Sequence, residues 1–595
     1  MEAENVKWRE ARRSRTPEKK REPTFIPKFP NIPVLEDYGL ATYPDDYWNT
    51  WPFSKLSDYK VSSWASPEIL EEICKEAGVD TSHGLAAQVI SDLKSGADIG
   101  AKGRSRLAST GPNTTEAIEH GDRVQDTLAS FISMGVYTGP VKMEEVENMG
   151  VKIHPINVKV KDNGSVRVIT DASYPRSKDL ASEDDTIPAS LNAFIDSKQF
   201  PTKMEGLPNF VEELWNQGRD ARIMKADMEA AYKHIPVRVE DFPLQAIKWG
   251  DRVLFDQKLM FGTVSSAGIF DRFNMLLVIL SVKLSGIEKE KVKRYLDDTF
   301  GTESKLGSKL SVFYNTYLDT CERVGVKMDK SGDPRKGQPP GTTATILGAN
   351  FDTTSWTWSL STDKGAKILE AIDDILKGDA CQRLEKKKNL KQRQSLVGKL
   401  IHYSYLLPES KQHMTTLFQY SETGNAKDSA FRADLTWWRT AIKRGVMGVP
   451  IPLPADSVPG CKVEVFPDAA GPSKGSISRG LGWVVLPNLW AYSCWPGWLT
   501  RESEIGPTVI QHGFKIRFTN KLSWMESLGP LWAITGLGNQ CTGRTLLVWV
   551  DNIGTVGAFN KGYSTRCLFL NAVVSAAATV CKGLGTKLVV KHMPR

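Results

Sequence analysis

The chain has 595 residues, which is too long for one ordinary hydrophobic core and predicts three or four domains. Its 77 Lys and Arg against 69 Asp and Glu give a net charge of +8, an excess that by itself favours nucleic acid only weakly. The longest apolar run, residues 275–284, is too short to cross a bilayer, and the eight cysteines form no Cys-x-x-Cys pair. We therefore expect no membrane association, disulfide scaffold or zinc module, and an intracellular location in the cytoplasm, the nucleus or both.

The first two segments carry no recognisable chemistry. Residues 1–30 are basic and poor in apolar side chains, which predicts a disordered tail; it is either a nuclear-localisation or RNA-contacting arm or simply a solvated segment. Residues 31–114 form an N-terminal extension, in which apolar residues recur at helical spacing from Ile69 to Ile73 and from Leu85 to Leu93.

Residues 115–364 alternate short β-rich runs with helical segments, as a mixed α/β sheet requires. We expect strands at 157–161, 165–170 and 222–226, and a helix at 270–283. A hairpin turn is expected at 162–164, and Tyr295-Leu296-Asp297-Asp298 is expected as a turn between two further strands.

The C-terminal part divides into two further segments. Residues 365–455 are helical and basic around 383–393, which indicates either a solvated helix face or a thumb that grips nucleic acid. Residues 456–595 are β-rich, with expected strands at 461–466, 481–486 and 546–550.

A first set of acids stands at predicted strand ends. Asp227 ends the strand at 222–226, and Asp297 and Asp298 arrive from the hairpin that we expect beside it. Three carboxylates would hold two divalent metals about 3.5 to 4 Å apart, an arrangement that serves phosphoryl transfer. The alternative is a surface Asp-Asp turn and an unrelated aspartate.

The neighbouring residues favour a nucleotide site. Lys159, Lys161 and Arg167 flank the turn at 162–164, where their charges can meet a triphosphate. The run Phe261-Gly262 to Gly268 opens a helix with small residues, so the backbone can approach a base pair. Tyr232 is placed to lie under the sugar, where its ring would exclude a 2′-hydroxyl.

These motifs make the chain resemble the reverse transcriptases. Asp227 with Tyr232 is similar to the family's first metal motif and its sugar-discriminating aromatic residue, and residues 295–298 match its Tyr-x-Asp-Asp signature. The resemblance implies that Lys161 and Arg167 bind the triphosphate and that residues 346–351 form the hairpin that grips the primer. One departure is Phe261, where retroviral enzymes have Gln. The finer resemblance is to long-terminal-repeat-class retroelements and most of all to DIRS-like retrotransposons, with a gypsy-like origin as the alternative, through residues 190–192, 261–262 with 265–267, 396–402 and 435–438.

A second set of acids lies in the C-terminal segment. Asp468 ends one predicted strand, Glu526 enters a helix and Asp551 ends another strand, so they could hold two metals that activate water against RNA. Their order resembles an RNase H domain, with a longer interval than expected between the first two. The run 591–595 resembles the segment just before the family's fourth carboxylate, so we expect a C-terminally truncated domain and a less secure nuclease.

The resemblance implies an α+β multidomain fold: a right-hand polymerase with fingers and palm at 115–364, a thumb or connection at 365–455 and an RNase H-like domain at 456–595. It implies an RNA-directed DNA polymerase of a retrotransposon that uses two Mg²⁺ per active site, with Mn²⁺ as a substitute. The implied partners are an RNA template, a DNA primer, the RNA–DNA hybrid, dNTPs and other proteins of the element. The alternative is a decayed or host-adopted remnant that binds nucleic acid without catalysis. The implied dNTP-binding residues are Lys161, Arg167, Tyr232, Phe261 and Gly262. The implied catalytic and metal-binding residues are Asp227, Asp297, Asp298, Asp468, Glu526 and Asp551.

Overall fold

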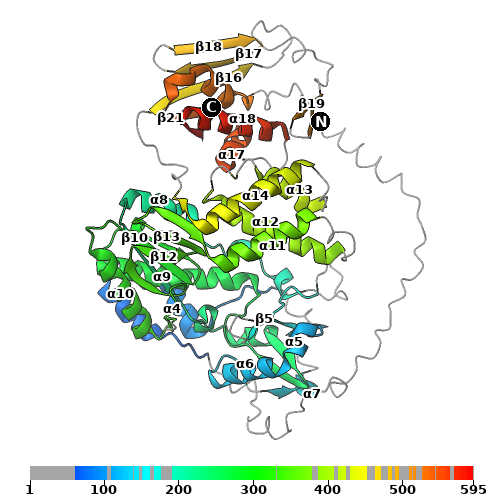
Figure 1. Cartoon of the computed structure of the whole chain (residues 1–595). Coiled ribbons are helices and arrows are strands. Elements are labelled where there is room, and N and C mark those ends of the chain that lie inside the picture. Colours follow the sequence, from blue (N-terminus) through cyan, green and yellow to red (C-terminus); the bar gives the residue numbers. More distant parts are fainter. Residues whose placement is uncertain are drawn as a thin grey trace, which may run out of the picture.

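A computed structural model gives the architecture of the chain (Figure 1). It describes residues 61–102, 109–138, 140–146, 151–160, 166–175, 190–329, 332–377, 386–407, 410, 413–423, 429–451, 462–470, 480–485, 489–494, 508–511, 514–517, 526–542, 544–562 and 568–593. The basic tail and residues 31–60 and 103–108 of the predicted N-terminal extension lie outside these residues. None of the described helices combines the length and apolar character needed to cross a membrane.

The centre of the molecule is a four-stranded antiparallel sheet in the order β11-β6-β10-β9. Its strands are β6 (Arg222–Asp227), β9 (Val292–Tyr295), β10 (Asp298–Glu303) and β11 (Gln338–Gly341). Side chains of β6 alternate between two cores, with Met224 and Ala226 in one and Ile223 in the other. Because the strand is buried on both faces, its position is fixed from both sides.

Helices cover both faces of this sheet. The first core contains apolar residues of α9 (Val264–Ser285) and α10 (Lys309–Val324), and the second contains those of α8 (Leu207–Gln217). The helix that we predicted at 270–283 is confirmed, but it begins six residues earlier because Val264–Ile269 continue the same buried pattern.

The helical pattern before residue 100 is confirmed as α3 (Pro67–Glu76) and α4 (Gly84–Ser95). Ser66 caps α3, since its hydroxyl accepts from the Ile69 amide at 3.2 Å. The helix α3 packs against α9 and α10, and α4 packs against α9 and α3, so these two helices share a core with the central sheet.

A second α/β unit lies beside the central sheet (Figure 1). The predicted strands at 157–161 and 165–170 are confirmed as the antiparallel pair β4 (Ile156–Val160) and β5 (Val166–Thr170), while the predicted turn at 162–164 lies outside the described residues. The unit also contains a five-stranded sheet in the order β1-β3-β7-β8-β2 and three helices. These elements are β1 (Ser109–Thr110), β2 (Val141–Lys142), β3 (Lys152–His154), β7 (Ala246–Trp249), β8 (Arg252–Phe255), α5 (Thr115–Glu119), α6 (Gly121–Ser133) and α7 (Met143–Val146).

Short 3-10 turns connect these strands and helices. They are η4 (Leu191–Phe194), η5 (Ser197–Gln199), η6 (Ala231–His234), η7 (Val239–Leu244) and η8 (Lys289–Lys291). The turn η6 begins four residues after the end of β6, and it places Tyr232 close to the end of the central sheet.

The predicted helical segment 365–455 is confirmed, and it packs on a small sheet in the second core. The helices are α11 (Thr362–Lys377), α12 (Lys386–Ser404), α13 (Thr415–Thr423) and α14 (Ser429–Met447), and the sheet is β12 (Thr343–Ile346), β13 (Ala349–Asp352), β14 (Thr357–Leu360) and β15 (Val449–Pro450). Most side chains of the basic run 383–393 lie outside the described residues, so the choice between a solvated and a nucleic-acid-binding face stays a prediction.

The C-terminal segment has its own mixed sheet and its own core. The sheet has the order β18-β17-β16-β21-β22, in which β16, β21 and β22 are parallel and the other pairs are antiparallel. Its strands are β16 (Lys462–Ala470), β17 (Gly480–Val485), β18 (Leu489–Cys494), β21 (Thr545–Val550) and β22 (Lys587–His592), with a separate ribbon of β19 (Thr508–Gln511) and β20 (Phe514–Arg517). The helices are α16 (Gly529–Leu537), η11 (Gly538–Cys541), α17 (Ile553–Lys561) and α18 (Leu568–Leu584). The predicted α+β multidomain fold is confirmed.

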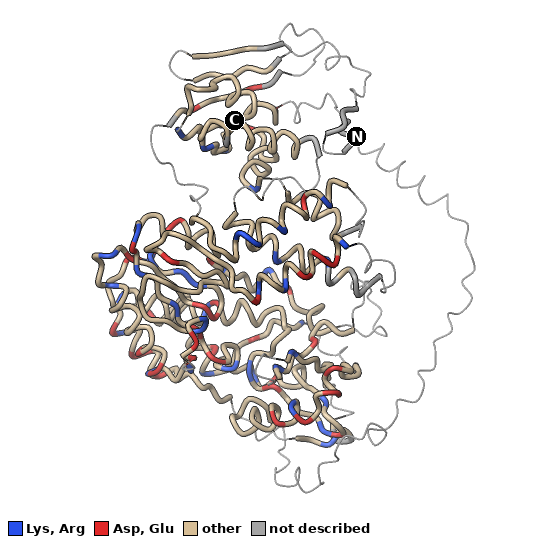
Figure 2. Tube along the Cα trace, viewed as in Figure 1, with Lys and Arg blue, Asp and Glu red and all other residues tan. Residues whose placement is uncertain are grey.

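Charged residues are distributed unevenly over these units. Figure 2 shows Lys and Arg interspersed with Asp and Glu over the central sheet and its helices, whereas charges are sparse in the described part of the C-terminal sheet. The acids at the end of the central sheet therefore lie in a part of the molecule where basic residues are also frequent.

Candidate active site

The central sheet brings three acids to one end. Strand β10 runs antiparallel to β6 with Asp298 opposite Asp227, and directly opposed residues have Cα atoms about 4.5 to 5.5 Å apart. The intervening hairpin turns sharply, with Leu296 at a φ of 53°, and the Met228 amide donates to the Asp297 carbonyl at 3.3 Å. Backbone pairing thus brings the three acids together: Asp227 ends β6, Asp298 begins β10, and Asp297 lies in the turn before it.

Burial and mutual repulsion act on these carboxylates. The Asp227 residue is only 6% exposed, and burial, with the Asp298 charge beside it, raises the pKa of Asp227 to about 6 against the opposing pull of Lys336. Burial and the charge of Asp227 likewise raise the pKa of Asp297. Ionisation of these two carboxyl groups is therefore less favourable in the folded chain than in water.

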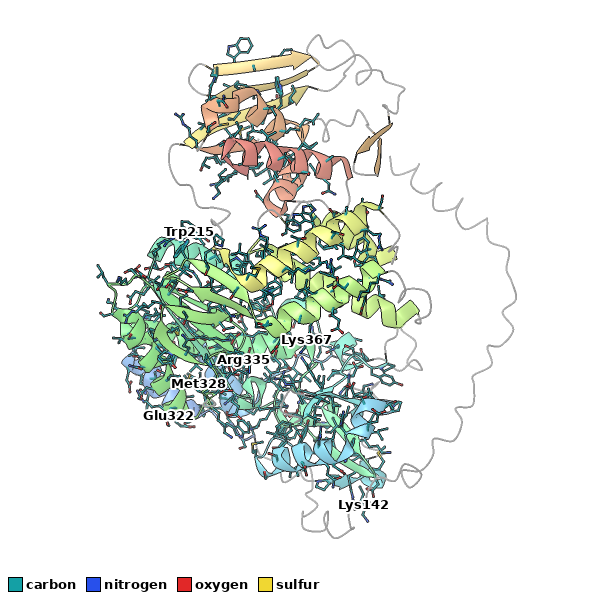
Figure 3. All side chains as sticks on the ribbon, in the orientation of Figure 1. Lys142, Trp215, Glu322, Met328, Arg335 and Lys367 are labelled. Atoms are coloured by element: carbon teal, nitrogen blue, oxygen red, sulfur yellow. The ribbon has the colours of Figure 1, made fainter. Side chains whose placement is uncertain are left out.

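Two lysines pair with the acids. The ammonium nitrogen of Lys225 lies 2.9 Å from a carboxylate oxygen of Asp298, and that of Lys336 lies 2.7 Å from a carboxylate oxygen of Asp227. Lys225 also donates to the Arg335 carbonyl at 2.9 Å. The segment after α10 that carries Arg335 and Met328 can be followed in Figure 3. Neither lysine was singled out from the sequence, because both partners are distant along the chain.

The acids fit divalent cations in charge and donor type. Three carboxylates face two ammonium groups, and hard cations such as Mg²⁺ prefer carboxylate oxygens. Within the part of the chain that the structure describes, no three or more His, Cys, Asp or Glu side chains are already arranged around a metal-sized centre. Lysine ammonium groups instead supply the positive charge beside Asp227 and Asp298.

The raised pKa of Asp227 predicts that Asp227→Asn stabilises the metal-free protein. A raised folded-state pKa means that the ionised carboxylate is unfavourable in the folded protein above pH about 6, and this cost fades as the pH falls toward the unfolded value near 3.8. In EDTA at pH 8 we expect the substitution to raise the melting temperature by roughly 2 to 4 °C, and at pH 4 to leave it unchanged. Lys336 is 45% exposed at its side chain and can be hydrated once its partner is neutral.

Thermal melts at the two pH values measure this difference. The matched control is Asp319→Asn, because the Asp319 side chain is 68% exposed and its partner Arg323 lies 4.0 Å away. A destabilised Asp227→Asn protein at pH 8 would show that the ion pair with Lys336 outweighs burial and repulsion.

An aromatic pair adjoins the acids. Tyr232 lies in η6, its ring centroid is 5.0 Å from that of Phe261, and burial together with the charge of Asp297 raises its pKa. Its ring also meets Phe270 of α9 edge-on at 5.6 Å. The two rings thus form one wall next to Asp297.

The backbone beside Phe261 is closely packed. Gly262 has a φ of 102°, and a Cβ there would collide with the Thr170 carbonyl oxygen at the end of β5. Asn192 holds this turn, since its amide group donates to the Gly262 carbonyl at 2.8 Å and accepts from the Val264 amide at 2.9 Å. The sequence indicated Asn192 only as part of the run 190–192. Its role in stabilising the turn at Gly262 depends on the two hydrogen bonds seen in the structure.

The hairpin of β4 and β5 presents basic side chains. Lys159 and Arg167 are Cα partners across it, so both side chains stand on one face, and both are exposed. Lys161 lies outside the described residues. Arg167 is therefore the described member of the predicted triphosphate-binding pair, and its role stays a prediction.

The second set of acids lies in the C-terminal sheet and beside it. Asp468 lies within β16 opposite Gly482 and is exposed, rather than ending its strand as predicted, because pairing with β17 continues to Ala470. The parallel pair Val465 and Val548 sets the register, so Asp468 and Asp551 each stand three residues further along. The amide of Asn552 donates to Glu526 at 3.1 Å, which brings Glu526 to the Asp551 end of β21.

Fold and site define the class of this chain: an α+β multidomain protein with three carboxylates at the end of an antiparallel sheet. No family model and no curated protein matches its sequence. Among solved structures, the chain is similar to a foamy viral protease-reverse transcriptase in complex with double-stranded DNA, at 12% identity and a TM-score of 0.44, over 92% of this chain and 84% of that one.

Two further structures of that protein give similar values. One, also with double-stranded DNA, matches at 14% identity and a TM-score of 0.43 over 88% of this chain and 96% of that one. The other, with an RNA/DNA hybrid, matches at 11% identity and a TM-score of 0.41 over 89% of this chain and 83% of that one. All three TM-scores lie below 0.5, so the function proposed next rests on the site and its motifs.

Proposed function

We propose that this chain is an RNA-directed DNA polymerase that transfers nucleotides from dNTPs with two Mg²⁺ ions. The observation that carries the proposal is the register of the central sheet, which sets Asp298 opposite Asp227 with Asp297 at the turn between β9 and β10. Burial, and after it the charge of a neighbouring carboxylate, raises the pKa of Asp227 and of Asp297, and bound cations would stabilise the ionised forms of both groups.

The residues of the site have distinct parts in this reaction. Asp227 and Asp297 would hold the metals, and Asp298 would support the site through its ion pair with Lys225. When bound, the ions lower the pKa of the primer 3′-hydroxyl and stabilise the departing pyrophosphate. Arg167, together with Lys161, would orient the triphosphate so that its α-phosphate faces the primer.

The wall formed by Tyr232 and Phe261 would select the sugar. An aromatic ring beside Asp297 leaves no room for a 2′-hydroxyl on a nucleotide held by the same acids, so deoxynucleotides are favoured. A steric contact of this kind discriminates by excluding one group from a closely packed position.

The proposal extends to the origin of the chain, its C-terminal domain and its location. We infer that the chain derives from a retrotransposon of the DIRS-like type, on the motifs at 190–192, 261–267, 396–402 and 435–438. Asp468, Glu526 and Asp551 would give the C-terminal domain an RNase H activity on RNA–DNA hybrids, for which the shared register of Asp468 and Asp551 is the support. The proposed location is the cytoplasm or nucleus, where template RNA and DNA are found.

Primer extension tests the function directly. The full chain, incubated with a DNA primer on an RNA template and dNTPs, should extend the primer in Mg²⁺ and stop when EDTA is added. Mn²⁺ should restore part of the activity. Binding of the primer-template without any extension in either metal would contradict the proposal and support the alternative of a non-catalytic remnant.

A further inference from the structure

The turn η6 carries a second residue beside Tyr232 whose burial is unusual. Lys233 follows Tyr232 directly, and its residue surface is only 2% exposed, whereas Tyr232, which packs against Phe261, is half-buried. Lysine is almost never fully buried unless its charge is paired. A buried ammonium next to the proposed sugar-selecting ring therefore needs a structural account.

The Lys233 ammonium joins two segments of the chain. It forms an ion pair with Asp256, which is completely buried, and it donates to the Leu259 carbonyl at 3.1 Å. Leu259 stands two residues before Phe261, and the same ammonium lies 5.5 Å from the centroid of the Phe261 ring. One charged group thus binds both the turn that carries Tyr232 and the segment that carries Phe261.

The partner carboxylate is itself held firmly. The Lys258 amide donates to the Asp256 carboxylate at 3.0 Å, and the side-chain amide of Gln245 donates to the carbonyls of Asp256 and Lys258, each at 3.0 Å. The Leu259 amide also donates to the Ile235 carbonyl at 3.0 Å, directly after η6. The ion pair and these hydrogen bonds together hold η6 against the segment 256–259.

We propose that the Lys233–Asp256 ion pair is a positioning element that sets the gap between Tyr232 and Phe261, and through this gap the choice of deoxynucleotides over ribonucleotides. The proposal rests on the polymerase function proposed above. Two charges inside a protein are held in a defined geometry, because their partners must stay in contact, whereas apolar side chains of similar size could slide. Loss of the pair would leave the rings present with a looser separation.

The test compares nucleotide selection in variants that differ only at this pair. The main variant is Lys233→Met with Asp256→Asn, which removes both charges of the pair together. The buried Lys258 ammonium, on which the Asp256 charge also acts, keeps its hydrogen bond to the Ser62 carbonyl. Single-nucleotide extension on an RNA template gives kcat/KM for a dNTP and for the matching rNTP. We expect the ratio of dNTP to rNTP to fall by about tenfold or more in the double variant, and Lys233→Arg, which can keep the ion pair, to retain most of the selection.

The control substitution is Asp241→Asn. Asp241 is also completely buried and paired with a basic residue, Arg238 at 3.1 Å, and it accepts a hydrogen bond from the Ile99 amide at 3.3 Å, on segments other than those of Tyr232 and Phe261. The ratio should stay at the wild-type value in this control. A melting curve of each variant separates a loss of fold from a change in selection.

The remaining outcomes overturn the proposal in recognisable ways. If the double variant selects dNTPs as strongly as the wild type, or loses both substrates by the same factor, the pair supports only the fold. If the wild-type chain extends no primer at all, the proposed polymerase function is wrong, and the role of the ion pair, which rests on that function, is wrong with it. Should the double variant not fold, Asp256→Asn alone, which keeps the hydrogen-bonding shape, must lower the ratio, and an unchanged ratio there refutes the role.

Discussion

Replacing Asp297 with Asn is expected to reduce primer extension by about 10³-fold or more, because a neutral amide cannot hold a divalent cation as a carboxylate does. Asp297 stands at the turn between β9 and β10, and the charge of Asp227 acts on it. The fold of the turn should be unchanged in this variant, because the Met228 amide donates to the backbone carbonyl of residue 297, which the substitution keeps. The measurement is the steady-state rate of dNTP incorporation on an RNA template in Mg²⁺.

The same variant should bind the primer-template almost as tightly as the wild type. Binding depends mainly on contacts to phosphates along the duplex, to which one active-site acid contributes little. Fluorescence anisotropy of a labelled primer-template gives this affinity, and Asp319→Asn, at a well exposed position, is the matched control for both measurements. Extension by Asp297→Asn at the wild-type rate would remove this acid from the proposed metal site.

The local elements of the site could be predicted from the sequence, because they depend on near neighbours. The alternation of Ile223 and Lys225 up to Asp227 indicates a strand that ends in an acid, and the structure has β6 at Arg222–Asp227. The sequence Tyr295 to Asp298 indicates a hairpin turn, and Leu296 adopts the positive φ of such a turn. Patterns with a period of two or of about four residues are visible within a short window, which is why α3 and α4 were also found.

The partners of the acids could not be predicted, because they come from distant segments. Lys336 follows Asp227 by more than a hundred residues. Its segment reaches the site through the pairing of β11 with β6 and through backbone contacts such as the Asp329 amide, which donates to the Asp227 carbonyl at 3.0 Å. Lys233 resembles any basic residue of a solvated turn in the sequence, and its burial depends on Asp256 and the Leu259 carbonyl. Electrostatic pairing of this kind is a property of the folded chain and leaves no periodic signal.

Truncating the ring of Tyr232 is the second change with a large expected effect. In Tyr232→Ala, the wall beside Asp297 loses the group that contacts Phe261 at a centroid distance of 5.0 Å and Phe270 at 5.6 Å. A 2′-hydroxyl can then enter the vacated volume, so we expect incorporation of rNTPs relative to dNTPs to rise by roughly 10- to 100-fold. The measurement is kcat/KM for matched dNTP and rNTP pairs on the same RNA template.

Tyr232→Phe separates the ring from its hydroxyl. Phenylalanine keeps the volume next to Phe261 and removes only the phenolic group, whose pKa is raised by burial and by the charge of Asp297. If the ring excludes the 2′-hydroxyl sterically, Tyr232→Phe should select dNTPs as the wild type does, while Tyr232→Ala should not. Equal loss of selection in both variants would instead assign the discrimination to a hydrogen bond of the phenol, and unchanged selection in both would place the sugar away from this wall.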